Sequence, residues 1–252
     1  MDRMIHLALN SLKNLRVDQR INAQNLANLQ VPGFKKDMPV TRSSAFLSAM
    51  DQYNSRIFVT ADDKLRFSDA EGFVERTEGK LDFAIRGPGY FFINPNQGGE
   101  AALSRRGDFT LLPDGSLVDG ANNRLLDNNL QPITLPAARN IIIDDAGKIV
   151  IEPFGSPEGT RQEVGILGTT LAEGVDLIKG PDGQIRPLNG DLPIADQRAG
   201  IMQGSLERSN VDSLEALLKN IEGQRSFELN VKFIKQAEMI DEATTKIMRL
   251  PG

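Results

Sequence analysis

The sequence of 252 residues contains no cysteine, no tryptophan and a single histidine, His6. The absence of cysteine excludes disulfides, thiolate metal ligands and cysteine nucleophiles. His6 lies in the first turns of an amphipathic pattern with no acid or nucleophile beside it. We therefore interpret it as a helix-surface or interface residue and not as a general base. No nucleophile–base pair or set of metal ligands is apparent, so the sequence predicts no enzyme activity, no cofactor and no metal site.

Long apolar runs and an excess of positive charge are also missing. The formal net charge is −5 and the isoelectric point is about 5.1, which argues against nucleic acid as a partner. No apolar run approaches the roughly 18–20 residues of a membrane span. The first residues, MDRMIHLALNSLKNL, lack an uninterrupted apolar stretch and a small-residue cleavage site. We therefore expect neither membrane insertion nor a cleaved signal peptide.

Helical periodicity dominates both ends of the chain. Apolar residues recur every three or four positions from Arg3 to about Leu29, and Pro32-Gly33 ends this pattern. A second pattern starts near Ser209 or Asn210, either of which is a suitable N-cap. Its roughly 40 residues would span about 60 Å, whereas a compact domain of this size has a radius of gyration of about 18 Å. The C-terminal helix is therefore expected to extend past its own domain and to need a second helix as a partner.

The middle of the chain, roughly 56–200, has the pattern of a β domain. Short apolar runs alternate with Gly, Pro, Asp and Asn, among them RIFVT, LDFAI, YFFIN, DFTLL, NIIID, KIVIE, EVGILG and QIRPL. A turn unit that leads into a strand recurs as PDGSLV, DAGKIV and PDGQIR. We expect an antiparallel, strongly twisted sheet, whose topology this pattern does not define.

These observations predict an α+β fold in which long N- and C-terminal helices pair as a coiled coil beside a central antiparallel twisted β domain. Four segments follow from the patterns. They are an N-terminal assembly helix at 1–36, a connector at 37–56, the β domain at 57–200 and a C-terminal assembly helix at 201–252.

Three asparagines, Asn22, Asn25 and Asn28, lie one helical turn apart beside the apolar stripe of the N-terminal helix. In one interpretation the two terminal helices simply pair with each other and cap the β domain. In the other they are interfaces for copies or relatives of this chain, where polar side chains along an apolar face would fix the register. The sequence leaves open which helix these amides face.

Two further motifs suggest other functions. The stretch RGPGYFF (86–92) is similar to a phosphate loop, but it lacks the Lys-Ser/Thr pair and is followed by a strand. The stretch SRRGD (104–108) contains Arg-Gly-Asp, a motif that would suggest adhesion, yet it leads directly into the strand FTLL. We interpret both as tight turns.

Three separated blocks resemble the flagellar rod and hook protein family. They are NAQNLANLQVPGFKK near the N-terminus, GKLDFAIRGPGYFFI with LSRRGDFTLLPDGSLVDGANNRLLD in the centre, and QGSLERSNVDSLEALLKNIEGQRSFELNVK towards the C-terminus. The resemblance covers nearly the whole chain. Its start, its length and its short 37–79 segment are most similar to the proximal rod subunit. The resemblance implies passage through the flagellar export apparatus without a cleaved signal, and assembly in the rod that spans the periplasm.

We therefore expect a structural subunit of the flagellar basal-body rod that packs head-to-tail with copies of itself and related rod proteins. Because such packing does not close, it produces a filament that can transmit torque. Two alternatives remain: the distal rod protein of the same family, and a secreted β-rich binding module. An enzyme is a third alternative. The residues predicted for the assembly interface are Asn22, Asn25, Leu26, Asn28, Gly33, Phe34, Leu214, Leu218, Ile221, Gln224, Arg225, Phe227, Val231 and Ile234.

Overall fold

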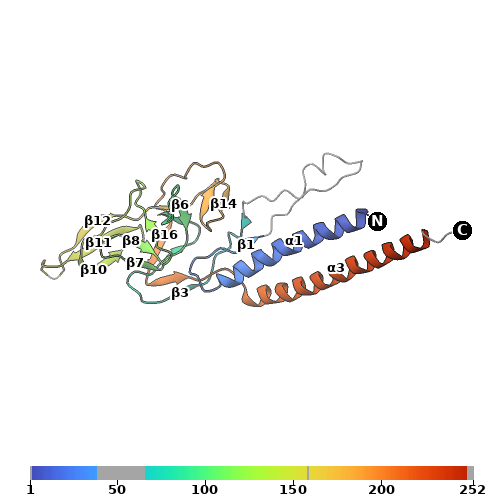
Figure 1. Cartoon of the computed structure of the whole chain (residues 1–252). Coiled ribbons are helices and arrows are strands. Elements are labelled where there is room, and N and C mark those ends of the chain that lie inside the picture. Colours follow the sequence, from blue (N-terminus) through green and yellow to red (C-terminus); the bar gives the residue numbers. More distant parts are fainter. Residues whose placement is uncertain (1, 39–65, 158, 249–252) are drawn as a thin grey trace. The chain divides into compact units, whose positions relative to one another are not determined.

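The computed structural model describes residues 2–38, 66–157 and 159–248 (Figure 1). These residues form two compact units. The helical unit comprises 2–27, 37–38 and 212–248, and the β unit comprises 28–36, 66–157 and 159–211. Most of the predicted connector at 37–56 and the predicted strand RIFVT lie outside the described residues. The division into four segments therefore stays a prediction.

Strands make up most of the β unit. Their bounds are β2 Arg66–Phe67, β3 Val74–Arg76, β4 Phe83–Arg86, β5 Tyr90–Asn94, β6 Ala102–Ser104, β7 Phe109–Leu111, β8 Leu117–Asp119, β9 Arg124–Leu125, β10 Ala138–Ile143, β11 Lys148–Pro153, β12 Gln162–Ile166, β13 Thr169–Thr170, β14 Leu177–Lys179, β15 Ile185–Pro187, β16 Gly200–Gln203 and β17 Ser205–Glu207. The short strand β1, Asp37–Met38, belongs to the helical unit.

The strands of the β unit pair in an antiparallel manner. The largest sheet has the order β14-β15-β6-β5-β9-β8-β7, with β13 also paired to β5. A three-stranded sheet has the order β10-β11-β12, while β16 pairs with β4 and β17 pairs with β3. The prediction of an antiparallel β domain is confirmed.

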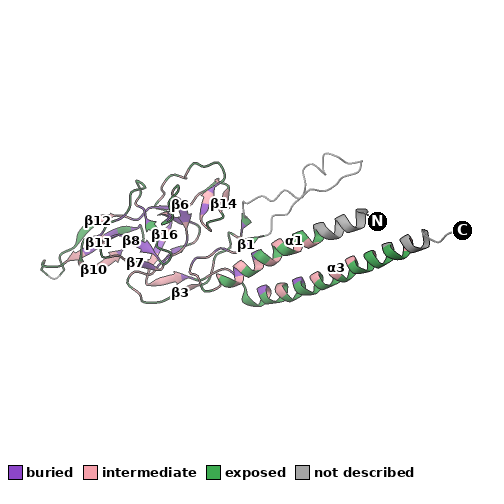
Figure 2. Cartoon of the chain, viewed as in Figure 1, coloured by how far each residue is buried: buried purple, intermediate pink, exposed green. Residues whose placement is uncertain are grey.

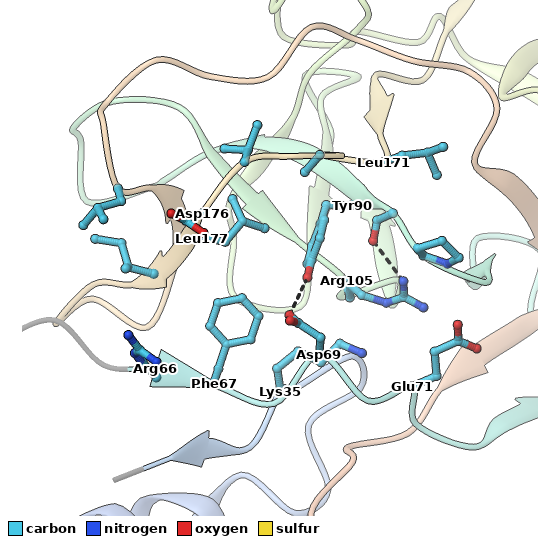
Figure 3. A pocket seen from close by; sticks show the side chains of 16 residues that line it. Lys35, Arg66, Phe67, Asp69, Glu71, Tyr90, Arg105, Leu171, Asp176 and Leu177 are labelled. Atoms are coloured by element: carbon cyan, nitrogen blue, oxygen red, sulfur yellow. Dashed lines mark hydrogen bonds between the residues drawn. The ribbon is translucent and has the colours of Figure 1, made fainter. Parts of the chain in front are cut away.

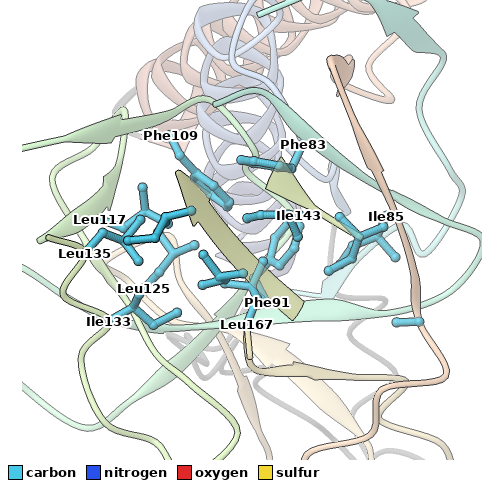
Figure 4. Close-up of a cluster of buried hydrophobic side chains, with 14 residues drawn as sticks. Phe83, Ile85, Phe91, Phe109, Leu117, Leu125, Ile133, Leu135, Ile143 and Leu167 are labelled. Carbon is cyan, nitrogen blue, oxygen red and sulfur yellow. The ribbon is translucent and has the colours of Figure 1, made fainter. Parts of the chain in front are cut away.

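Strand β5 lies between two hydrophobic clusters, which explains its uninterrupted apolar sequence YFFIN. Phe91 belongs to the larger cluster, whereas its neighbours Tyr90 and Phe92 belong to the smaller one. Successive side chains of a strand point to opposite faces, so a strand that is buried on both sides needs apolar residues at every position. In the larger cluster Phe109 packs edge-on against Phe91 with ring centroids 5.3 Å apart (Figure 4).

The recurring turn unit has a common hydrogen-bonding pattern. In PDGSLV the Ser116 N–H donates to the Asp114 carboxylate at 2.9 Å, and Gly115 has a φ of 82°. In DAGKIV the Lys148 N–H donates to the Asp144 carboxylate at 2.9 Å. In PDGQIR the N–H of Gln184 donates to an aspartate two residues earlier. In PDGSLV and PDGQIR the aspartate of the motif therefore closes the turn that starts a strand, as the sequence predicts, whereas the acceptor at DAGKIV, Asp144, is the residue that precedes the motif.

The predicted fold class, α+β with the terminal helices paired as a coiled coil, is wrong. The described residues form 17 strands and only two helices, α1 (Asp2–Ala27) and α3 (Ser213–Met248). Leu214, Leu218 and Ile221, which were predicted for the assembly interface, are 65%, 52% and 47% exposed. The buried positions in this part of α3 are instead the small residues Ala216 and Gly223. Further along α3 the large apolar residues Phe227, Val231 and Ile234 are half-buried.

Candidate assembly surface and buried junction

Helix α3 starts later than predicted, and Asp212 is its N-cap. The Asp212 carboxylate accepts hydrogen bonds from the N–H groups of Leu214 at 2.8 Å and Glu215 at 3.1 Å. These bonds satisfy two of the free amides at the helix start. Asn210, one of the two predicted caps, instead bonds to Lys36 and Ser68 within the β unit.

Helices α1 and α3 lie side by side within the helical unit (Figure 1), and small and polar residues contribute to their contact. A Cβ added at Gly223 would lie 3.4 Å from the Gln19 side chain, so these two residues are in close contact. The Asn22 side-chain amide donates to the Ala216 carbonyl at 2.7 Å. Asn22 therefore faces the chain's own C-terminal helix, which answers for this residue the question that the sequence left open.

The apolar residues of α3 that face away from this contact are exposed (Figure 2). With about 100° between successive helical residues, Leu214, Leu218 and Ile221 lie roughly 140° or more around the helix from Ala216. The predicted residues Gln224 and Arg225 are exposed as well, while Phe227, Val231 and Ile234 are half-buried. We call the exposed α3 face the set of large apolar side chains Leu214, Leu217, Leu218, Ile221, Leu229, Phe233, Met239 and Ile240.

Asn25 is buried inside the helical unit and binds the backbone of Asp37 in both directions. Its amide donates to the Asp37 carbonyl at 2.9 Å, and its carbonyl oxygen accepts from the Asp37 N–H at 2.7 Å. Asn25 is 3% exposed in the single chain. Leu26 and Asn28 are half-buried. Whether these residues contact another subunit stays a prediction.

The motif residues Gly33 and Phe34 lie in the β unit. The Gly33 N–H donates to the Glu207 carbonyl at 2.7 Å, and a Cβ at Gly33 would overlap the Arg105 carbonyl. The φ of 66° at this position also favours glycine. The ring of Phe34 lies 3.7 Å from the Lys179 ammonium, a cation–π contact. Both residues therefore hold the segment after α1 against the rest of the β unit.

A buried carboxylate, Glu207, lies at the centre of this arrangement. Its Oε1 is 3.1 Å from the Lys35 ammonium and accepts the Gly72 N–H at 2.8 Å. Its Oε2 is 2.5 Å from Arg105 Nε. The side chains of Glu207, Lys35 and Arg105 are all 3% exposed or less. We call these three residues the buried junction.

The cations of the buried junction also bind backbone carbonyls. Arg105 donates to the carbonyls of Gly87 at 2.8 Å and Gly89 at 2.9 Å, and Lys35 donates to Ala70 at 2.8 Å. Burial, together with the charge of Arg105, lowers the pKa of Lys35 although Glu207 opposes this shift. The buried junction therefore holds two cations and one carboxylate, and burial there disfavours the charged form of Lys35.

Sequence reasoning missed Lys35, Arg105 and Glu207. Each lies in one of the three motif blocks, in PGFKK, LSRRGD and QGSLERSN respectively. The sequence signal for these residues is that each motif block contains a charged residue close to glycine and apolar residues. Charge alone, however, does not show which distant residues will pair.

A cavity of about 510 Å³ lies next to the buried junction, with Lys35 and Arg105 among its lining residues (Figure 3). Phe67, Tyr90 and Leu177 are among the apolar residues of its wall. The charged residues that line it are three cations and three carboxylates: Lys35, Arg66, Arg105, Asp69, Glu71 and Asp176. This balance selects neither an anionic nor a cationic ligand.

Tyr90 is expected to make the stability of the β unit sensitive to alkaline pH. Burial and the neighbouring Asp69 raise the pKa of Tyr90 from 10.0 to about 12. The unfolded chain therefore releases this proton near pH 10, while the folded chain holds it until about pH 12. The contribution of Tyr90 to the free energy of unfolding is fully present below pH 10, and this contribution of roughly 2–3 kcal/mol should be lost as the pH rises from 10 to about 12.

The free energy of unfolding of the wild type and of Tyr90→Phe, measured from pH 9 to 12, checks this expectation. The lowered pKa of Lys35 has the opposite sign, since it adds stability as the pH rises towards 10.5, but it is common to both proteins. The difference between the two curves therefore isolates Tyr90. Parallel curves above pH 10 would contradict the assignment.

The Arg-Gly-Asp motif is closed by an internal ion pair. In Arg-Gly-Asp, the guanidinium of Arg106 pairs with the carboxylate of Asp108 at 2.6 and 2.9 Å, so the motif forms a closed turn. Among the described residues no group of three or more His, Asp or Glu side chains could hold a metal ion. None of the described helices combines the length and apolarity that crossing a bilayer requires.

Comparison with known proteins agrees with the resemblance of the motif blocks. The chain matches the sequence model of the flagellar hook protein FlgE/F/G D1 domain at residues 84–151 and that of the flagellar basal body rod FlgEFG protein C-terminal region at 202–247. It is 29% identical to the basal-body rod protein FlgF of Salmonella typhimurium, over 94% of this chain and 95% of the relative. It is 28% identical to FlgF of Caulobacter vibrioides, over 99% and 100%, and 26% identical to the rod protein FlgG of Bacillus subtilis, over 98% and 99%.

The family matches contain the central strands of the β unit and most of α3, and the relatives align along nearly the whole chain. The alignment with FlgF of Caulobacter vibrioides covers 99% of the chain and so extends over the three motif blocks that contain Lys35, Arg105 and Glu207. The two domain matches and the relatives together support a flagellar rod protein that resembles FlgF.

Proposed function

We propose that this chain, a structural subunit of the flagellar basal-body rod, occupies the proximal part of the rod and packs against related rod subunits and its own copies. Its similarity to FlgF relatives over nearly their whole length supports this role. The distal rod protein is the alternative, because FlgG of Bacillus subtilis aligns equally fully. The family is structural, and we propose no catalytic role; the earlier alternative of a secreted binding module is replaced by the family assignment.

The observation that carries the assembly mechanism is the exposed α3 face. A helix that leaves several large apolar side chains in water on one side is a candidate for burial against another protein. The contact with α1 uses Ala216 and Gly223 and leaves Leu214, Leu218 and Ile221 uncovered. In a rod of related subunits, the occupant we propose for this face is a terminal helix of a neighbouring rod subunit. The exposed α3 face of one subunit would then contact a different surface of its neighbour, and contacts between unlike surfaces propagate along a filament.

Leu218→Asp is expected to leave the isolated protein folded and to abolish its incorporation into the rod. Leu218 is 52% exposed, so the folded monomer should change by no more than about 0.5 kcal/mol. A carboxylate buried without a partner at a subunit contact is strongly unfavourable. We expect unchanged circular dichroism and melting of the purified variant, but no swimming when it replaces the wild type in a cell.

Ser226→Asp is the matched control, because it adds the same charge to α3 at an exposed polar position outside the exposed α3 face. This variant should swim normally. Normal motility and normal basal bodies with Leu218→Asp would rule out the exposed α3 face as the assembly contact.

A further inference from the structure

Three stretches of the β unit meet at the buried junction. In the β unit these stretches are 33–36, which follows α1, 68–73, which follows β2, and 207–210, which precedes α3. They are far apart in sequence, but they contact one another. The Ser68 N–H donates to the Lys36 carbonyl at 2.9 Å, and the Arg208 N–H donates to the Phe73 carbonyl at 2.8 Å. We call them the connecting stretches.

Glu207 binds residues of the other two connecting stretches directly. Its backbone carbonyl accepts the Gly33 N–H, and its carboxylate accepts Lys35 and the Gly72 N–H. The same carboxylate binds Arg105, which in turn donates to carbonyls of the loop between β4 and β5. One side chain therefore joins all the connecting stretches to the core sheet.

Asn210 supplies a second set of bonds between the same stretches. Its side-chain oxygen accepts the Lys36 N–H at 2.6 Å, and its amide donates to the carbonyls of Ser68 at 3.1 Å and Ala70 at 2.7 Å. Its own N–H donates to the Phe34 carbonyl at 3.2 Å. Unlike Glu207, it carries no charge, so its removal leaves no buried ion without a partner.

We infer that Glu207 is a positioning residue, which holds the three connecting stretches together as one body within the β unit. Two buried cations converge on it, and without its negative charge they repel each other and the stretches separate. The core clusters around Phe91 and Leu117 do not include these stretches and remain folded. The inference goes beyond the proposed function and does not depend on it, because all three stretches lie within the β unit.

Amide hydrogen exchange on the purified full-length chain tests this inference without rod assembly. In Glu207→Gln the shape is kept and the charge is removed. The amides of Gly33 and Asn210, which bond across the connecting stretches, are expected to exchange about 100-fold faster or more, because the two cations lose their counter-ion. The amide of Leu117, which donates to Ile133 in the core, is expected to exchange as in the wild type.

Glu75→Gln is the control, since it removes an exposed carboxylate that pairs with Arg208 between β3 and β17. Its exchange should match the wild type. If Glu207→Gln does not fold, Asn210→Ala is the second variant, and it should accelerate exchange at Lys36 and Gly33 by about 10-fold through the loss of uncharged hydrogen bonds. Unchanged exchange at Gly33, or equal acceleration at Gly33 and Leu117, would overturn the inference. Because this readout uses the monomer, it is independent of the motility test of the exposed α3 face.

Discussion

Gly107→Ala is expected to destabilise the β unit by about 3 kcal/mol or more, because the new methyl group has no space. A Cβ at Gly107 would overlap the carbonyl oxygen of Phe83, the first residue of β4. This approach is part of a backbone pairing, since the Phe83 N–H donates to the Gly107 carbonyl at 3.0 Å. The obstacle is backbone and not a flexible side chain, so the strand itself has to move. Phe83 is fully buried in the larger cluster, and that movement disturbs the core.

Urea unfolding followed by circular dichroism measures the effect, and the absence of tryptophan makes this signal preferable to fluorescence. Gly165→Ala is the control: Gly165 lies in strand β12, and a Cβ there would meet nothing within 4 Å. Its stability should change by no more than about 0.5 kcal/mol. Equal midpoints for Gly107→Ala and Gly165→Ala would show that the contact with Phe83 is not tight. Gly107 is the glycine of Arg-Gly-Asp, so the result also tests the interpretation of that motif as a structural turn.

Local patterns predicted the β unit well because its strands and turns follow local rules. The run YFFIN is apolar at every position since β5 is buried on both faces, and Asp114 closes the turn before β8 with a bond two residues away. Neither feature requires knowledge of a distant residue. The three motif blocks likewise indicate the family from the sequence alone.

The coiled-coil pairing of the terminal helices was predicted wrongly, because apolar periodicity does not show which part of a helix's stripe its own chain covers. Leu218 and Ile221 mark an apolar stripe, but helices approach closely where side chains are small. Gly223, which in sequence looks like a weak point in a helix, is where Gln19 packs. The sequence shows that a helix has an apolar face, but it does not show whether that face is covered by its own chain.

The buried junction was missed for a different reason, which is the distance along the chain between its members. Lys35 and Glu207 are 172 residues apart, and Arg105 and Glu207 are 102 apart. No periodic pattern connects them, and most charged residues are exposed on folded proteins. Only the fold shows that these three belong to one site.

The two cations of the buried junction are expected to differ strongly when each is replaced by methionine, which keeps the length and removes the charge. Arg105→Met should destabilise the β unit by about 4 kcal/mol, because it breaks a buried ion pair and removes the donors to Ile85, Gly87 and Gly89. Lys35→Met should cost about 1 kcal/mol, the value of a typical hydrogen bond, here the one to Ala70.

The difference follows from the count of charges. Without Lys35, the carboxylate of Glu207 still faces Arg105, and one cation balances one anion. The lowered pKa of Lys35 points the same way, since it shows that burial and repulsion by Arg105 outweigh the attraction of Glu207 for the charged amine. Urea midpoints of the two variants, measured at neutral pH by circular dichroism, give the comparison. If Lys35→Met proved as damaging as Arg105→Met, the lysine would be an essential counter-ion of Glu207, and the junction would depend on both cations equally.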